Sequence, residues 1–169
     1  MSSTLRLSCL AILFCTTLAR DASFLVQQLN SVSDTHTSVM GGALNTCSKP
    51  GMALTGFTRD GHCQEVGGDD AGSHHICIQM KPDFCTVTGQ PDWCSEKAGC
   101  MGQSGECPIG NWCVCQWAFA RYIEMAGGCD SIVDLVCDAT NMAAFTAYKT
   151  STEPSHKVAL ACIQKKCGL

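Results

Sequence analysis

Short stretches of this sequence alternate hydrophobic with polar or small residues, which is the period of a half-buried β-strand. The alternation is clearest at residues 75–80, where Ile76, Ile78 and Met80 share one side. Residues 54–58 form a shorter stretch of this kind, and residues 132–137 form an apolar run with the character of a strand. Residues 111–115 predict a strand or a turn that leads into a helix.

The second half of the chain carries helical patterns. Residues 116–126 predict a helix that ends at Gly127 and Gly128. Four side chains share its apolar face: Phe119, Tyr122, Ile123 and Ala126. Trp117 falls on the opposite, polar face. A second helix is predicted from Thr140 or Asn141 to about Tyr148, and a third over residues 155–165.

Between these patterns, residues 81–110 are rich in Pro, Gly, Ser and Cys. We predict that this segment is an irregular loop held by disulfides, because a structureless loop of such length needs a restraint. Strands and helices do not alternate regularly, which favours an α+β fold over a doubly wound sheet. The predicted architecture is a compact two-layer domain with short strands, a few helices and a disulfide-rich loop segment.

The N-terminus has the pattern of a signal peptide, with a short basic start, a largely apolar run over residues 7–19 and small residues at its end. We therefore expect a signal peptide at residues 1–19, a flexible segment at 20–38 and a single cysteine-rich domain at 39–169. A chain with such a signal peptide is expected to be secreted or delivered to the endomembrane lumen. The alternative is a bipartite leader for a complex plastid, because Phe24 follows the apolar run.

Composition excludes some functions and leaves others open. Only 15% of the 169 residues are charged, and the net charge is −4. Basic residues do not cluster, so nucleic acid is not an expected partner. No later segment is long enough for a membrane span, so none is expected in the mature protein.

Fifteen cysteines are the strongest chemical feature of the chain. Removal of the predicted signal peptide leaves thirteen: Cys47, Cys63, Cys77, Cys85, Cys94, Cys100, Cys107, Cys113, Cys115, Cys129, Cys137, Cys162 and Cys167. This density in an exported chain predicts disulfides, and the odd number leaves at least one thiol unpaired or otherwise used.

Four segments in order resemble a known family. They are residues 39–44 leading to Cys47, residues 54–63, residues 69–77 and residues 110–115. Together they are similar to the domain of unknown function 2237, a family of small, mostly bacterial, uncharacterised proteins. The resemblance implies a compact α+β domain and no established activity. Where that family tends to show His-Glu, this chain has Asn141 and Met142.

The resemblance also divides the cysteines. Five lie in the shared segments: Cys47, Cys63, Cys77, Cys113 and Cys115. The other eight form an even set, which permits four additional bridges. We therefore expect the unpaired cysteine, and any thiol or metal chemistry, among the five.

Two groups of residues could bind a soft metal. Cys113 and Cys115 form a C-x-C pair that shares one face in a strand, and such a pair can ligate a metal, exchange disulfides or make separate structural bridges. His62, Cys63, His74, His75 and Cys77 also suit zinc chemically, although their spacing matches no standard zinc motif. The alternative for His74 is a structural bond to loop backbone.

Arg59 and Asp60 could bind an anion and act as a base, or simply form a turn with Arg59 paired to Asp69 or Asp70. Trp112 and Trp117 flank the C-x-C pair and could line a pocket, pack in the core or be covered by the cysteine-rich loop.

The primary hypothesis is a secreted, disulfide-stabilised binding or structural module with an unknown partner. The alternative is a thiol- or metal-dependent protein that uses Cys63, His74, Cys113 and Cys115, with a zinc-like metal possible but not favoured. Whether the protein is an enzyme stays open, as do its cofactors. The candidate functional cluster contains eight residues: Arg59, Asp60, Cys63, His74, Cys77, Trp112, Cys113 and Cys115.

Overall fold

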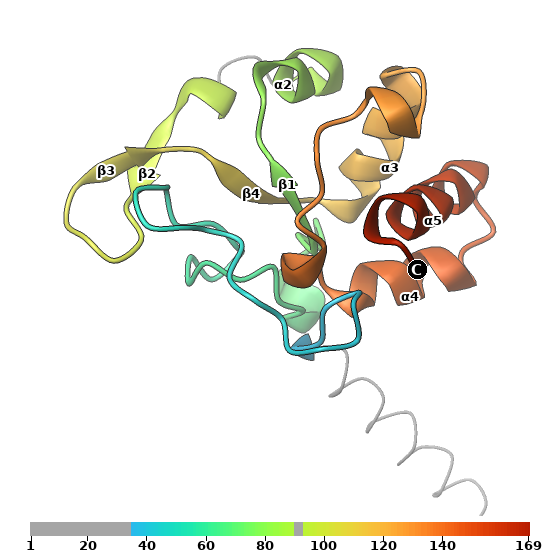
Figure 1. Ribbon diagram of the computed structural model, residues 1–169, viewed down its shortest axis with the longest axis horizontal. Helices are drawn as coiled ribbons and strands as arrows, with labels where there is room; N and C mark the ends of the chain where they lie inside the picture. Colours follow the sequence, from blue (N-terminus) through green and yellow to red (C-terminus); the bar gives the residue numbers. More distant parts are fainter. Residues whose placement is uncertain (1–34, 90–92) are drawn as a thin grey trace, which may run out of the picture. The chain divides into compact units, whose positions relative to one another are not determined.

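The computed structural model describes residues 35–89 and 93–169. The expected signal peptide, and the expected flexible segment up to residue 34, lie outside the described residues. The described chain has the predicted α+β fold, with two small antiparallel sheets and four α-helices (Figure 1). From Thr35 onward the chain contacts the domain, because the Asn141 side chain donates a hydrogen bond to the Thr35 carbonyl and the Met142 amide donates one to the Thr37 carbonyl.

The central sheet pairs β1 (Ile76–Gln79) with β4 (Asn111–Val114). The strands are antiparallel, and Cys77 lies opposite Cys113. Both predicted strands are therefore confirmed. The pairing joins segments more than thirty residues apart and leaves the chain in position to enter the next helix directly after Val114.

Two other strand predictions are wrong. Residues 54–58 form a turn, because Gly56 adopts φ +87° and the Arg59 amide donates to the Gly56 carbonyl. Residues 132–137 run beside β1 but form only the isolated bridge between Ile78 and Leu135. Residues 132–137 do bond to β1, because the Gln79 amide donates to the Asp134 carbonyl and the Val136 amide donates to the Cys77 carbonyl. These bonds do not extend into a ladder, and side-chain alternation alone does not reveal that difference.

The segment 81–110 is more regular than predicted. It contains α2 (Pro82–Thr88), β2 (Lys97–Gly99) and β3 (Glu106–Pro108), and the two strands pair as a small hairpin. Pro82 starts α2, and Gly89 ends it in the left-handed conformation. The predicted disulfide restraint is present, because Cys85 bonds Cys94 and Cys100 bonds Cys107.

The three predicted helices are confirmed as α3 (Gln116–Met125), α4 (Met142–Thr150) and α5 (Pro154–Cys167). Asn141 caps α4 by accepting a hydrogen bond from the Ala143 amide at 2.9 Å. Helices α3 and α4 both pack against α5 (Figure 1). Single 3₁₀ turns complete the described chain: Gly67–Asp69, Trp93–Ser95, Cys129–Ser131 and Cys137–Ala139.

The main core lies between the central sheet and the helices. Phe119, Tyr122 and Ile123 bury the predicted face of α3, whereas Trp117 is 40% exposed. Tyr122 donates its hydroxyl to Asp83 at 3.0 Å, and burial together with that bond raises its pKa to about 12. Within the described part of the chain, no helix is both long and apolar enough to cross a membrane.

Six disulfides tie these parts together, and they respect the division of the cysteines made from the sequence. The eight cysteines outside the shared segments bond only to one another, which adds Cys129–Cys162 and Cys137–Cys167 at α5. The five shared cysteines form Cys47–Cys77 and Cys63–Cys113, and they leave Cys115 as the one free cysteine of the described residues. The prediction that the unpaired cysteine is one of these five is confirmed.

Removal of a bridge should destabilise the domain according to the length of chain that it closes. The Cys129–Cys162 bridge spans 33 residues and Cys85–Cys94 spans 9. We expect replacement of the first pair by alanine to lower the free energy of unfolding by about 3–4 kcal/mol, and of the second by about 2–3 kcal/mol. Urea unfolding without reductant measures both, and equal or reversed losses would contradict the argument from chain entropy.

Candidate functional site

A cleft of about 410 Å³ opens where the loop before β1, strand β4 and the start of α3 meet. Five of the eight candidate residues line it: Arg59, His74, Trp112, Cys113 and Cys115. Apolar side chains supply the other walls: Phe57, Phe84, Val114 and Ala118. Asp60, Cys63 and Cys77 are not among its lining residues. The cleft therefore combines an apolar surface with a guanidinium, an imidazole and a thiol.

Arg59 reaches the cleft from a tight loop. Its backbone has φ +57°, and the loop turns at Gly56, where a β-carbon would lie 2.2 Å from the His62 carbonyl oxygen. The guanidinium carbon lies 4.9 Å from the centre of the Trp112 ring, a cation–π contact. Its Nη1 also donates to the Gly56 carbonyl at 3.5 Å. Arg59 therefore stacks on Trp112 instead of pairing with Asp69 or Asp70.

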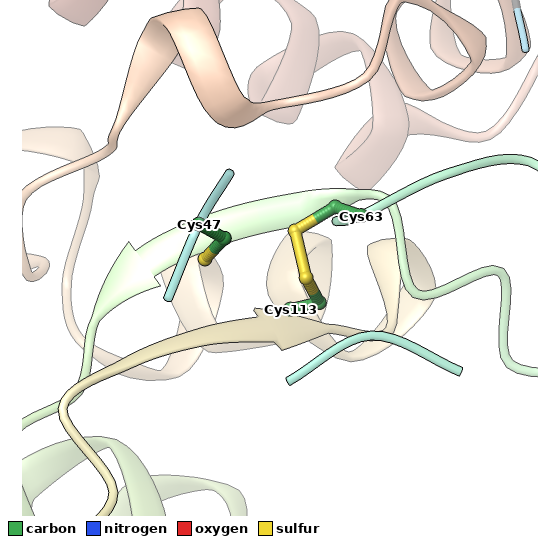
Figure 2. A group of neighbouring side chains, drawn as sticks. All are labelled: Cys47, Cys63 and Cys113. Carbon is green, nitrogen blue, oxygen red and sulfur yellow. A yellow bond between two sulfur atoms is a disulfide. The ribbon is translucent and has the colours of Figure 1, made fainter. Parts of the chain in front are cut away.

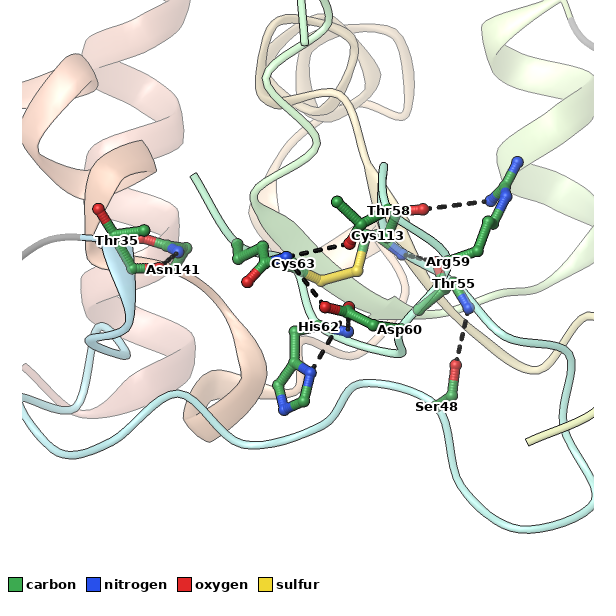
Figure 3. Close-up of polar contacts among 12 residues, drawn as sticks. Thr35, Ser48, Thr55, Thr58, Arg59, Asp60, His62, Cys63, Cys113 and Asn141 are labelled. Carbon is green, nitrogen blue, oxygen red and sulfur yellow. Dashed lines mark hydrogen bonds and ion pairs between the residues drawn. A yellow bond between two sulfur atoms is a disulfide. The ribbon is translucent and has the colours of Figure 1, made fainter. Parts of the chain in front are cut away.

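Hydrogen bonds fix this loop to strand β4 (Figure 3). The Thr55 hydroxyl accepts from the Cys113 amide at 2.8 Å, and the Thr55 amide donates to the Ser48 hydroxyl at 2.9 Å. Asp60 stays within its own loop, where it accepts from the His62 amide at 2.9 Å and from the Gln64 side chain. Asp60 is thus used to shape the turn that presents Arg59.

His74 is held by a buried carboxylate. Asp70 is 3% exposed, and its Oδ1 lies 2.6 Å from Nδ1 of His74 while its Oδ2 accepts from the His74 amide at 2.7 Å. Burial opposes the charge on Asp70, but the bonds to His74 outweigh it, so the pKa of this carboxyl lies below its usual value of 3.8. The pair orients the imidazole at the cleft wall.

His75 belongs to a separate, buried polar contact. Its Nδ1 lies 2.9 Å from the Gln116 side-chain oxygen, and its Nε2 lies 3.2 Å from a Glu65 carboxylate oxygen, at ion-pair distance without hydrogen-bond geometry. His62 lies 3.5 Å from Asp60 on an exposed loop. The five residues that suited zinc in the sequence are therefore divided among different surroundings.

Cys115 is the N-cap residue of α3 and is half-buried. The next amide, that of Gln116, donates a hydrogen bond to the Ser73 carbonyl. Tyr148 from α4 donates its hydroxyl to the Gln116 carbonyl, and burial together with the nearby Cys115 raises the pKa of that hydroxyl. The free thiol thus lies between the cleft and the contact of α3 with α4.

The metal set considered from the sequence does not come together as free ligands. Cys63 and Cys113 are bonded to each other, so neither sulfur is a thiolate in this state. Cys115 and His74 remain at the cleft.

Trp117 lies outside the cleft. Its ring centre is 5.0 Å from that of His156 and 6.3 Å from that of Tyr148. The cysteine-rich loop does not supply these contacts.

Sequence reasoning missed several parts of the site. Phe57 and Phe84 form cleft walls, and Asp70 orients His74. Asp70 lies in one of the family-like segments, so its nearness to His74 was a usable signal. Phe84 carries no such signal, because the composition of residues 81–110 predicts an irregular loop.

One protein family matches the chain that builds this cleft. The sequence profile of the uncharacterised proteins conserved in bacteria, DUF2237, matches residues 37–157. The chain belongs to this family. The match covers every residue named at the cleft and ends within α5. No curated protein is similar enough to count as a match. The DUF2237 assignment thus confirms the resemblance and gives the cleft no activity.

Acid should weaken the contact between Asp70 and His74. Because the pKa of Asp70 is lowered by folding, its contribution to stability is complete above about pH 4 and is lost as the pH falls further. We expect Asp70→Asn to cost about 1–3 kcal/mol of unfolding free energy at neutral pH, and less near pH 3. Urea unfolding across this range measures the difference.

The matched control is Asp69→Asn, because Asp69 is the exposed neighbour in the same turn. Its substitution should leave the stability nearly unchanged at every pH. An Asp70→Asn penalty that stays constant down to pH 3 would contradict the role given to the ionised carboxylate.

Proposed function

We propose that this DUF2237 domain binds a small anionic molecule with an apolar body in the cleft. The observation that carries the proposal is the position of Arg59, whose guanidinium lies over Trp112 at the cleft lined by Phe57 and Phe84. A planar guanidinium suits carboxylates, sulfonates and phosphates, because its N–H groups bind two oxygens at once. The apolar walls suit the remainder of such a ligand.

The arrangement of the loop supports a binding role. Arg59 lacks a carboxylate partner among the ion pairs of the described residues, and only the weak contact to the Gly56 carbonyl occupies its Nη1. A left-handed backbone at a non-glycine residue costs free energy, and such strain is common where a side chain must be presented to a ligand. His74, fixed by Asp70, adds a second polar group on the cleft wall.

We further propose that the protein works as a secreted or lumenal module. Six disulfides in the described chain suit an oxidising compartment, and the signal-peptide pattern at residues 1–19 supports export. Delivery to a complex plastid by a bipartite leader is the alternative address.

Binding can be tested with 8-anilinonaphthalene-1-sulfonate, an aromatic sulfonate whose fluorescence rises in apolar surroundings. We expect the native protein to bind it, and Arg59→Asn to weaken binding about tenfold, the loss typical of one hydrogen-bonded ion pair. Asparagine is chosen because it tolerates the left-handed backbone at this position. Fluorescence titration gives the dissociation constants.

Arg121→Asn is the matched control, since Arg121 is an exposed arginine on α3 that does not line the cleft. This control should bind the dye as the native protein does. Equal affinity of the native protein and the Arg59→Asn variant would overturn the proposed binding mode.

A second candidate function is thiol chemistry at Cys115. The specific observation is that the one free cysteine of the described residues lies at the same cleft and at the N-terminus of α3. A half-buried thiol that lines a cleft can be reached by a small electrophile bound there. A ligand bound through Arg59 would place its apolar body near the thiol.

Two alkylating agents of similar size test this candidate together with the binding mode. The Cys115 thiol releases its proton to the buffer, and its sulfur attacks the methylene carbon of iodoacetate or iodoacetamide, so that a C–S bond forms, the C–I bond breaks and iodide leaves. We expect the rate ratio of iodoacetate to iodoacetamide to be about tenfold higher at Cys115 than for free cysteine, because Arg59 attracts the carboxylate. Mass spectrometry at pH 7.5 measures both rates.

Arg59→Asn should return this ratio to that of free cysteine without changing the rate with the neutral iodoacetamide. An unreactive Cys115 in the folded protein would remove the thiol hypothesis and leave the binding proposal standing. An unchanged ratio in Arg59→Asn would count against Arg59 as the anion-binding group.

A further inference from the structure

Two disulfides lie side by side in the interior of the domain. Cys77 on β1 is opposite Cys113 on β4, and these residues bond respectively to Cys47 and Cys63 from the preceding loop. The sulfur atoms of Cys47, Cys63 and Cys113 all lie within 4.8 Å of one another, and Figure 2 shows Cys47 beside the Cys63–Cys113 bridge. The Cys77 sulfur is bonded to that of Cys47 but lies outside this group of three, so its side chain must rotate toward the group for all four sulfurs to meet.

The positions of these four cysteines do not depend on their sulfur–sulfur bonds alone. The Cys77 amide donates to the Thr140 hydroxyl at 3.1 Å, and the Cys113 amide donates to the Thr55 hydroxyl at 2.8 Å. The Cys47 amide donates to the Gly61 carbonyl at 2.8 Å, next to the segment that carries Cys63. These three hydrogen bonds hold the backbone of Cys47, Cys77 and Cys113 without the bridges, so the metal ion itself would have to draw Cys63 into the site.

We propose that Cys47, Cys63, Cys77 and Cys113 form a tetrahedral zinc site when both bridges are reduced. Four sulfurs bound to zinc at about 2.3 Å lie about 3.8 Å from one another. In the bridged state the Cys47 sulfur lies within 4.8 Å of both sulfurs of the Cys63–Cys113 bridge, so side-chain rotations that separate the bonded pairs after reduction can bring the sulfurs to this spacing. All four residues are at most 1% exposed, which fits a closed structural site without an open coordination position.

The chemistry requires a reductant, because the cysteines are bridged in this state. A phosphine such as tris(2-carboxyethyl)phosphine supplies two electrons to each bridge. Each reaction consumes one water, converts the phosphine to its oxide and produces two thiols. Zinc then displaces the four thiol protons and is held by four thiolates. Cys113 lines the cleft, which provides a path for the ion.

This inference is independent of the proposed ligand binding. Cys115 and His74 are not among the four sulfur ligands, although both belonged to the metal set considered from the sequence. The same four cysteines would therefore stabilise the fold by two bridges in an oxidising compartment and by one metal ion in a reducing one.

The test uses the full chain, reduced with the phosphine without oxygen and then given zinc or cobalt chloride. We expect about one metal ion per chain after desalting, together with the intense visible bands of tetrahedral cobalt thiolate. Cys63→Ser/Cys113→Ser should lose both signals. Cys85→Ser/Cys94→Ser is the matched control, because it removes the same number of thiols as another bridged pair, and it should keep both signals, as should Cys115→Ser.

Far-UV circular dichroism keeps the test decisive if the reduced chain unfolds. Zinc should then restore the helical signal of the native chain and of the Cys85→Ser/Cys94→Ser control, but not that of Cys63→Ser/Cys113→Ser, because binding free energy becomes folding free energy. Absence of bound metal overturns the proposal. Metal that is lost equally from both double variants, or that requires Cys115, overturns it as well.

Discussion

The two adjacent bridges Cys47–Cys77 and Cys63–Cys113 are the constraint on which the rest of the site depends. The chain before β1 has no strand or α-helix between residues 36 and 75, and a segment of this length does not hold one conformation by its own hydrogen bonds. The bridges tie Cys47 and Cys63, in the middle of this segment, to β1 and β4. The turn that presents Arg59 lies between them, so its position over Trp112 follows from the cross-links.

The eight remaining cysteines act elsewhere in the same domain. Cys129–Cys162 and Cys137–Cys167 tie α5 to the segment that follows α3, while Cys85–Cys94 and Cys100–Cys107 restrain the segment with α2 and the hairpin. None of these four pairs includes a residue that lines the cleft. The bridges therefore separate into a central pair that positions the cleft and a second set of four that stabilises the surrounding elements.

The sequence predicts the parts of this structure that have a local cause. The periodic face of α3, the Asn141 cap of α4 and the alternation in β1 depend on neighbouring residues, and all three predictions are confirmed. The strand expected at residues 54–58 fails because Gly56 turns the chain to pass close to His62, which is a non-local contact. Likewise, five candidate residues meet at one cleft, but the Phe84 wall and the stacking of Arg59 on Trp112 arise only from tertiary packing.

The position of the cleft depends on which sulfur bonds to which, and peptide mapping of the non-reduced protein tests this pairing most directly. After alkylation of free thiols and proteolysis at acidic pH, the account predicts peptides that join Cys47 to Cys77 and Cys63 to Cys113, with the alkyl group on Cys115. A peptide that joins Cys115 to Cys63, or any of the four cysteines of the central bridges to one of the other eight, would contradict this pairing.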